Sequence, residues 1–337
     1  MTLIQMKRVL VTGGAGYKGC VLVPKLLDEE YEVVVYDLML FGSHGLPSHP
    51  NLRVIKADIR DSEAFANAVA GSDAVIHMAC MSNDPSYELD PQLSKTINYD
   101  CFEPMVEASK QAGVRRFVYI SSSSVYGVSD APEVTEDHPL VPLTDYSKYK
   151  GMCETILLAH GSRDFVPVIL RPATVCGYSP RMRFDLTVNI LTNHAAKRGR
   201  ITVFGGAQKR PNIHIDDVTD LYVEALKYPD ELVSGKIFNV GYQNDTVARL
   251  AEIAKEIVER EFPGKEPIRV ETTSTNDNRS YHVSSRKILQ ELGYSPRRTI
   301  EDAVHDLCCA FKAGKFEDSL TNPEYVNVAT VKATALR

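Results

Sequence analysis

The fold of this chain is decided by Arg8-Val9-Leu10-Val11-Thr12 and by the loop that follows it directly, Gly13-Gly14-Ala15-Gly16-Tyr17-Lys18-Gly19. The first stretch is short and rich in β-branched residues, as buried strands are. The glycines at 13, 16 and 19 would let the backbone turn tightly, approach a pyrophosphate, and pack the helix predicted over 21–29 against the sheet. A helix N-terminus at this place favours negative charge. The junction therefore predicts the first βαβ unit of a dinucleotide-binding sheet.

A second strand, predicted over 32–36, ends in Asp37. A carboxylate at this place can accept both hydroxyls of a ribose and would repel a 2′-phosphate, so NAD is expected rather than NADP. The next strand, 52–57, leads to Asp58 and Ile59, which could frame an adenine. A structural turn without a ligand is the alternative interpretation. It is disfavoured because the strand, the glycines, the helix and the acid are all in register.

The composition is that of an ordinary globular protein. Its 337 residues are 44% hydrophobic and 24% charged, which suits one large domain or two fused ones. The net charge of −6 argues against nucleic acid or an acidic membrane surface as the main partner. The first residues lack the small-residue cleavage site of a signal peptide, and no apolar run is long enough to span a bilayer. Seven cysteines without C-x-x-C spacing predict reduced thiols in a cytoplasmic protein and no metal site.

Further strands are expected at the spacing of a doubly wound parallel sheet. Residues 74–79 form a nearly continuous apolar run around His77, which we interpret as a satisfied core histidine rather than a catalyst. Residues 98–112 predict a helix, and residues 116–120 predict the strand after it. That strand delivers the run Ser121-Ser122-Ser123-Ser124 at its carboxyl end, which is the edge where ligands bind in open α/β sheets.

The stretch Asp145-Tyr146-Ser147-Lys148-Tyr149-Lys150 carries the strongest chemical signal. Tyr146 and Lys150 lie four residues apart, so on a helix they share one face. A phenol titrates near ~10 in water, but a neighbouring ammonium can stabilise its ionised form and make it a general base. Taken alone, an aromatic residue at a helix start and a solvated lysine would be the simpler interpretation. The dinucleotide motifs upstream favour the catalytic one.

These motifs together resemble the extended short-chain dehydrogenase/reductase family, and within it the nucleotide-sugar epimerases and dehydratases. The resemblance extends to about residue 310. It rests on the glycines of the first loop, Asp37, Asp58-Ile59, the serine run with Val125-Tyr126-Gly127, and Tyr146-x-x-x-Lys150 followed by Glu154.

The family's fold implies an α/β architecture, a Rossmann doubly wound parallel sheet with a smaller C-terminal α/β substrate domain. The Rossmann domain would cover 1–175, with residues near 212–242 returning to it. The substrate domain would lie mainly within 176–315. Residues 316–337 would form a C-terminal extension that is either loose or a short packing segment.

The resemblance also implies roles for individual residues. In the family's mechanism Tyr146 takes a proton from a sugar hydroxyl while NAD accepts hydride, and Ser122 hydrogen-bonds the same oxygen. Lys150 would bind the nicotinamide ribose and, with the nicotinamide, lower the pKa of the tyrosine. Cofactor binding is expected at Gly13, Gly16, Tyr17, Lys18, Gly19, Asp37, Asp58, Ile59, Met78, Ala79, Asn98, Tyr146 and Lys150. Substrate binding is expected at Asn83, Ser123, Thr174, Cys176, Arg181, Arg183, Asn189, Arg210 and Arg279.

Several of these substrate positions leave alternatives open. Arg210 would contact the diphosphate of a nucleotide-diphosphate sugar, or it would be a surface residue of the turn 205–210. Arg181 and Arg183 could border the sugar or contact a carboxylate on a uronic acid. Cys176 stands where family members usually carry a tyrosine, and its thiol could move a proton or simply fill space, the second being favoured.

The serine run also discriminates among reactions. The family's 4,6-dehydratases carry Asp and Glu after the catalytic residue, and several epimerases that act beside a keto group carry a cysteine where this chain has Ser124. Ser123 and Ser124 cannot do that acid–base work, so epimerisation at C4 is the leading hypothesis. A nucleotide-sugar 4-ketoreductase or dehydrogenase is the first alternative, and a non-catalytic dinucleotide-binding regulator is the second. Family members commonly dimerise through two helices, here near 99–112 and 147–160, so a homodimer is expected.

Overall fold

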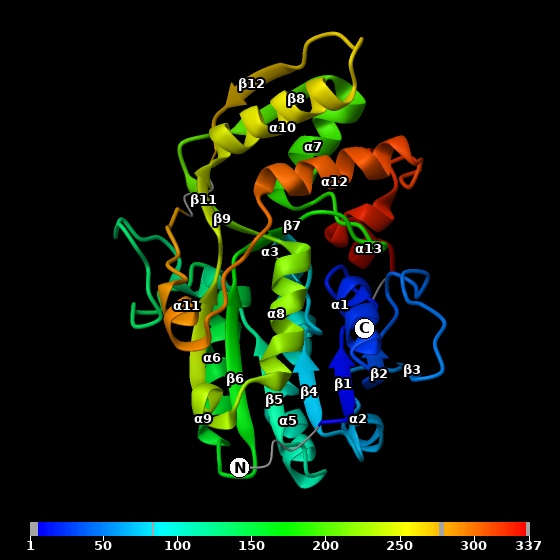
Figure 1. The fold of residues 1–337 in the computed structure, drawn as a ribbon, viewed down its shortest axis with the longest axis vertical. Coiled ribbons are helices and arrows are strands. Elements are labelled where there is room, and N and C mark those ends of the chain that lie inside the picture. The colour runs from blue at the N-terminus through cyan, green and yellow to red at the C-terminus, as the bar shows by residue number, and fades with distance from the viewer. Residues whose placement is uncertain (1–5, 83, 276–279, 335–337) are drawn as a thin grey trace.

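The computed structural model of the protein describes residues 6–82, 84–275 and 280–334. Within them, parallel strands form a seven-stranded sheet in the order β10-β6-β5-β4-β1-β2-β3 (Figure 1). The strands are β1 (Arg8–Thr12), β2 (Glu32–Asp37), β3 (Leu52–Lys56), β4 (Ala74–His77), β5 (Arg116–Ile120), β6 (Val166–Pro172) and β10 (Lys236–Val240). The predicted Rossmann fold is thereby confirmed.

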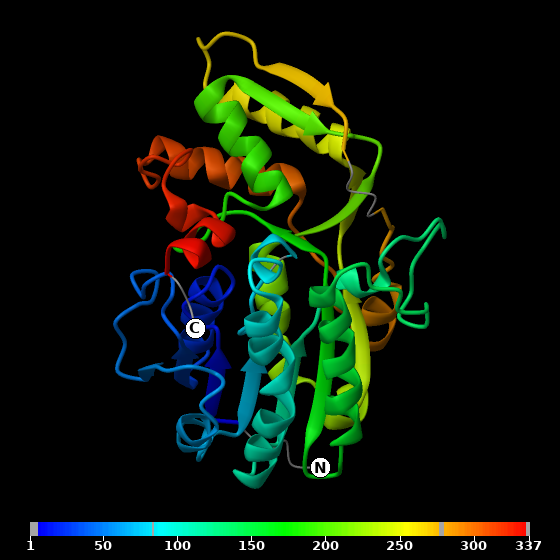
Figure 2. The same ribbon diagram turned by 180° about the vertical axis from the view of Figure 1, so that it is seen from behind.

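Helices cover both faces of this sheet. Figure 1 shows α1 (Gly19–Asp28) and α8 (Ile215–Lys227) in front of the strands, and Figure 2 shows α5 (Phe102–Gln111) and α6 (Asp145–Ala159) on the opposite face, where α2 (Ser62–Val69) packs beside α5. Because both faces are covered, the central strands β4, β5 and β6 are buried along their whole length. His77 lies in this core, and its Nδ1 is 2.7 Å from Thr12 Oγ1, as expected of a satisfied histidine.

A second unit sits above the carboxyl ends of the strands (Figure 1). The chain enters it after β6, returns to the large sheet for α8 and β10, and enters it again. The unit has a separate core, which includes Ile201, Leu250 and Val304. Its elements are β7 (Thr174–Cys176), α7 (Thr187–Arg198), β8 (Arg200–Phe204), β9 (Lys209–His214), β11 (Gln243–Thr246), α10 (Val247–Glu261), β12 (Arg269–Thr273) and α12 (Ile300–Lys312).

Shorter elements complete the described residues. They are α3 (Asp84–Tyr87), α4 (Pro91–Lys95), η1 (Thr96–Asp100), η2 (Ser123–Tyr126), α9 (Asp230–Val233), α11 (Arg286–Leu292), η3 (Pro323–Tyr325) and α13 (Asn327–Thr334). Among all these helices, none has the length and apolarity that a membrane span requires.

The chain passes from the large sheet to the smaller one after β6. Residues 169–177 are divided between two strands, because β6 ends at Pro172 while Thr174–Cys176 pair with β9 of the smaller sheet. Arg210 does not belong to a surface turn. It lies on β9 opposite Asp245 of β11, and its side chain is buried.

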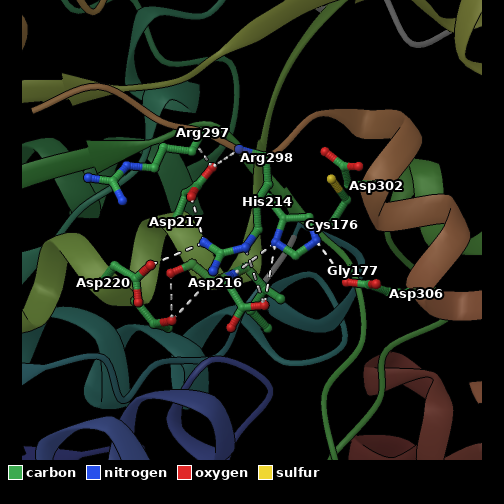
Figure 3. Close-up of polar contacts among 12 residues, drawn as sticks. Cys176, Gly177, His214, Asp216, Asp217, Asp220, Arg297, Arg298, Asp302 and Asp306 are labelled. Atoms are coloured by element: carbon green, nitrogen blue, oxygen red, sulfur yellow. Dashed lines mark hydrogen bonds and ion pairs between the residues drawn. The ribbon is translucent and has the colours of Figure 1, made fainter.

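A cluster of polar contacts joins α8 of the large sheet to the segment before α12 and to α12 in the second unit (Figure 3). Asp217 of α8 accepts hydrogen bonds from the backbone N–H groups of Arg297 and Arg298, and the Arg298 guanidinium donates to it at 2.8 Å. His214 caps α8, since its Nδ1 accepts the N–H of Asp216 at 3.1 Å. The other ring nitrogen, Nε2, therefore carries the proton, and it faces Asp306 Oδ2 of α12 at 3.2 Å. These contacts fix α12 against the start of α8.

Candidate active site

A cavity of about 500 Å³ opens at the carboxyl ends of the β-strands, and residues of both units line it. Most of the residues singled out in the sequence meet here. They are Gly13, Gly16, Tyr17, Lys18, Gly19, Asp37, Asp58, Ile59, Met78, Ala79, Ser122, Ser123, Tyr146, Lys150, Thr174, Arg181, Arg183 and Arg210.

The glycine loop forms one wall of the cavity. Gly13 has φ +71°, and a Cβ there would lie 2.8 Å from Ala79 N. A Cβ on Gly19 would lie 2.3 Å from Gly14 O, so the first turn of α1 can approach the loop only without a side chain. The result is a bare backbone cradle before a helix N-terminus, which suits a pyrophosphate.

The acidic strand ends lie beside this cradle. Asp37 ends β2, and its carboxylate accepts the N–H groups of Ala15 at 3.0 Å and Met39 at 2.7 Å. These bonds fix the carboxylate at the cavity wall, where a ribose would meet it. Asp58 is held by Arg60, whose Nη2 donates to it at 2.7 Å, so its pKa is lowered. Carboxylates at these places can accept hydrogen bonds from the free ribose hydroxyls of a dinucleotide.

The proposed catalytic side chains come from β5 and α6. Thr144 caps α6 by accepting the N–H of Ser147, which places Tyr146 and Lys150 on the helix face toward the cavity. Lys150 Nζ is buried and donates to Ile120 O at 2.9 Å, so the ammonium is fixed at the end of β5. The Ser122 hydroxyl lies beside Tyr146 and lowers the pKa of its phenol. Ser122, Tyr146 and Lys150 therefore form one constellation.

Burial and neighbouring groups act on the pKa of Tyr146 in opposite directions. Burial, followed by the nearby Cys80 and Asp84, raises this pKa well above its usual 10, whereas Arg183 and the Ser122 hydroxyl lower it. The expected lowering by Lys150 together with the nicotinamide stays a prediction, and the phenol needs it to act as the base.

A buried polar network supports the serine run from below. Arg171 of β6 donates to Glu154 of α6 with Nε at 3.0 Å and Nη2 at 2.6 Å, and both side chains are buried. Oε1 of Glu154, which accepts from Arg171 Nε, also accepts the hydroxyl of Ser121 at 2.5 Å. Arg171 also reaches Tyr126 Oη at 2.6 Å. This network ties the strand end to α6, and so sets the position of Ser122 relative to Tyr146.

Arg183 and Arg181 take different places in the cavity. Arg183 is paired with Asp185 at 2.8 Å and donates to Ser82 Oγ at 3.3 Å, so it borders the region in front of Tyr146. Arg181 lies with its guanidinium 3.6 Å from the centroid of the Phe41 ring, in the loop after β2. These contacts place Arg181 near the end of β2, and a contact with the sugar stays a prediction.

Three predicted binding residues do not line the cavity. Asn98 bonds both backbone groups of Met81 and so fixes the loop after β4. Asn189 accepts from Gly177 N and donates to Tyr17 Oη at 3.1 Å, bracing the wall from behind. Cys176 is buried in the core of the second unit with its Sγ 3.5 Å from Ile213 O, and burial raises the pKa of its thiol. These three predictions are corrected to supporting or packing roles, and Asn83 and Arg279 lie outside the described residues.

The sequence reasoning missed several cavity residues. Asp185 and Tyr281 line the cavity, and Tyr281 Oη is 3.4 Å from Ser123 Oγ. Asn327, in the segment taken as a C-terminal extension, lines it too. Asp185 had a sequence signal in its neighbour Arg183, whereas Asn327 had none, because its partners lie 142 to 245 residues away.

Residues 9–241 match the model of the "NAD dependent epimerase/dehydratase family". The match covers more than half of the chain. The chain belongs to this family. Its cofactor is accordingly NAD, and the resemblance to extended short-chain dehydrogenases/reductases is confirmed.

Relatives and solved structures agree with this assignment. The "Low-salt glycan biosynthesis protein Agl12" of Haloferax volcanii is 27% identical over 92% of this chain and 99% of its own length. A UDP-glucose 4-epimerase of Lactobacillus helveticus is 28% identical over 88% of this chain and 94% of its own. The structure of MoeE5 in complex with UDP-glucuronic acid and NAD has a TM-score of 0.78 at 28% identity, covering 91% of this chain and 99% of MoeE5. The family member described here is thus an NAD-dependent enzyme of the epimerase/dehydratase type.

Proposed function

We propose that the protein is a nucleotide-sugar epimerase that inverts C4 by transient oxidation and hydride return. The similarity to a UDP-glucose 4-epimerase and to a structure that binds UDP-sugars supports a nucleotide-diphosphate sugar as the substrate. Arg183 and Arg210, both buried and both lining the cavity, are cations suited to the diphosphate or to an acidic sugar.

The observation that carries the proposal is the chemistry beside Ser122. Ser124 Oγ is 2.9 Å from Ser122 Oγ and accepts a hydrogen bond from Ser147 at 2.8 Å. Ser123 faces Tyr281. The positions that would carry the acid and the base of a dehydratase therefore hold hydroxyls, which neither donate nor accept a proton outright near neutral pH. Asp84 lines the cavity, but it accepts the Thr144 hydroxyl at 2.6 Å and is held at the cap of α6.

The remaining residues suffice for one hydride and one proton. NAD, when bound, accepts hydride from the sugar carbon and returns it. Tyr146 Oη is the atom that takes the proton of the C4 hydroxyl, and it gives the proton back when the alcohol re-forms. Ser122 holds the same oxygen by a hydrogen bond, and Lys150 supplies positive charge on the same helix face.

Assembly and location are part of the proposal. We expect a homodimer formed through α5 and α6, as the resemblance implies, with the Rossmann and substrate domains divided near residue 175. The seven cysteines are free, and this supports a reducing compartment such as the cytoplasm.

The test combines ligand analysis with a substrate screen. The protein is expected to release NAD on denaturation and to interconvert a pair of C4-epimeric nucleotide sugars without added cofactor, detected by NMR of the product. A preparation that holds no NAD and binds none would contradict the proposal. Consumption of added NADH with a keto-sugar, without epimerisation, would favour the ketoreductase. A dinucleotide-binding regulator would show no turnover with any sugar.

A further inference from the structure

Asn327, the first residue of α13, uses each of its polar groups on a different cavity residue. Its Oδ1 accepts from Arg181 Nη2 at 2.6 Å, its Nδ2 donates to Ser82 Oγ at 2.7 Å, and its backbone N–H donates to Asp185 Oδ2 at 3.0 Å. The side chain is buried and lines the cavity. One residue of the tail thus joins the loop after β4 to the segment that carries the arginines.

The tail around Asn327 is packed rather than loose. The backbone carbonyl of Tyr325 accepts the N–H of Phe184 at 2.8 Å, and the two rings meet edge to face with centroids 5.3 Å apart. Val331 reaches the core of the large sheet. The views in Figures 1 and 2 agree, because α13 lies between the two units close to α1. The tail therefore contributes a wall of the cavity.

That wall reaches the end of β2 through Arg181. Arg181, which Asn327 holds, stacks on Phe41 beyond β2, close enough to Asp37 that its charge acts on that carboxylate. Arg181 is buried, and its Nε has no hydrogen-bond partner among the described residues. A buried cation with a spare donor suits an anionic or hydroxyl-bearing ligand at this place. The part of the cavity next to Asp37 and the glycine loop is the part that fits the dinucleotide.

We propose that Asn327 is a positioning residue that latches α13 and Arg181 over the dinucleotide, so that the cofactor leaves only when the tail detaches. The inference rests on the proposed function, because an epimerase uses the same NAD twice in each turnover and must not lose it between the two steps. It adds to that function a retention device assembled from residues of the tail.

The experiment measures exchange of bound NAD against isotopically labelled NAD by native mass spectrometry, without any sugar present. The variant is Asn327→Ala in the full chain. The matched control is Asn322→Ala, because Asn322 is an asparagine of the same tail whose side chain, among the described residues, accepts from Glu324 N and contacts no cavity residue. Asn327→Asp serves as the rescue variant, since a carboxylate still accepts from Arg181. Thermal unfolding establishes that each variant is folded.

Asn327→Ala is expected to speed exchange at least about tenfold, as loss of a hydrogen bond to a charged group would. Asn322→Ala should stay within about twofold of the wild type, and Asn327→Asp should recover part of the slow exchange. Unchanged exchange in Asn327→Ala overturns the proposal, as does rapid exchange in the wild type or an equal effect in both alanine variants. Because no sugar is used, these results are independent of whether the protein epimerises any substrate.

Discussion

The glycine-loop side of the cavity and the tail side differ in how far apart their contacting residues lie in the chain. On the first side Gly16 N–H bonds Gly13 O at 3.2 Å, and Tyr146 and Lys150 share one helix face. On the second side Asn327 reaches Ser82 across 245 residues and Arg181 across 146. Contacts between residues close in the chain form the cofactor cradle and the Tyr146–Lys150 pair. Contacts between residues far apart in the chain form the wall that Asn327 contributes to the cavity. The chemistry should therefore be sensitive to single changes on the first side, and retention and stability to changes elsewhere.

The largest effect is expected from Tyr146→Phe on the glycine-loop side. Removing the Oη that carries the proton should lower kcat by roughly 10²–10⁴-fold, while NAD stays bound because the cradle is unchanged. Progress is followed by NMR of the sugar nucleotide, and NAD content by chromatography of denatured protein. Tyr149→Phe is the matched control, since Tyr149 lies on the same helix but packs against Tyr99, with ring centroids 5.0 Å apart, instead of lining the cavity. Equal activity of both variants would remove Tyr146 from the proton transfer.

Arg171→Met tests the network beneath the serine run. It leaves Glu154 buried without its cation, so the free energy of unfolding should fall by about 3–5 kcal/mol. Urea unfolding measures this loss. The comparison is Arg249→Met, which breaks the exposed pair with Glu256 and should cost about 0.2–1 kcal/mol. If the two variants lose the same stability, the buried pair does not hold β6 to α6 in the way its contacts indicate.

Lys18 belongs to the glycine loop and gives the next largest effect. Burial, with the cations of Lys150 and Arg183 nearby, lowers the pKa of Lys18 from 10.5 to about 8. The ammonium is present below that pH and favours an anionic dinucleotide, and it is lost as the pH rises. The affinity for NAD should therefore fall roughly tenfold between pH 7 and pH 9.5.

Calorimetric titration of NAD into apo-protein measures this change. In Lys18→Met the affinity should be lower at pH 7 and nearly flat with pH. Lys148→Met, an exposed lysine of α6, should keep the wild-type profile. A wild-type profile in Lys18→Met would place the lysine away from the bound anion.

The same contrast explains what the sequence could predict. The glycine spacing, the acid at the end of β2 and the i,i+4 pair are local, so their geometry follows from one strand, turn or helix, and the Rossmann sheet follows from the apolar runs. Arg181, Asn189 and Cys176 lie outside any such unit. Whether each faces the cavity depends on how β7 and the segment after it cross between the units, and that is decided by packing against Phe41, Tyr17 and α7. The role of Asn327 depends on partners that no local pattern links to the tail.

The smallest effect is expected from Cys176→Ala. The sequence made Cys176 a candidate proton carrier, whereas the structure buries it in the core of the second unit. Cys176 pairs with His214 across β7 and β9, both labelled in Figure 3, its Sγ contacts Ile213 O, and it does not line the cavity. The change should leave kcat within about twofold and lower the free energy of unfolding by about 1 kcal/mol, as loss of a small buried group does. Cys80→Ala is the informative partner, because Cys80 lines the cavity and acts on the pKa of Tyr146. A tenfold loss of kcat in Cys176→Ala, with Cys80→Ala unaffected, would mean that the buried thiol takes part in the chemistry after all.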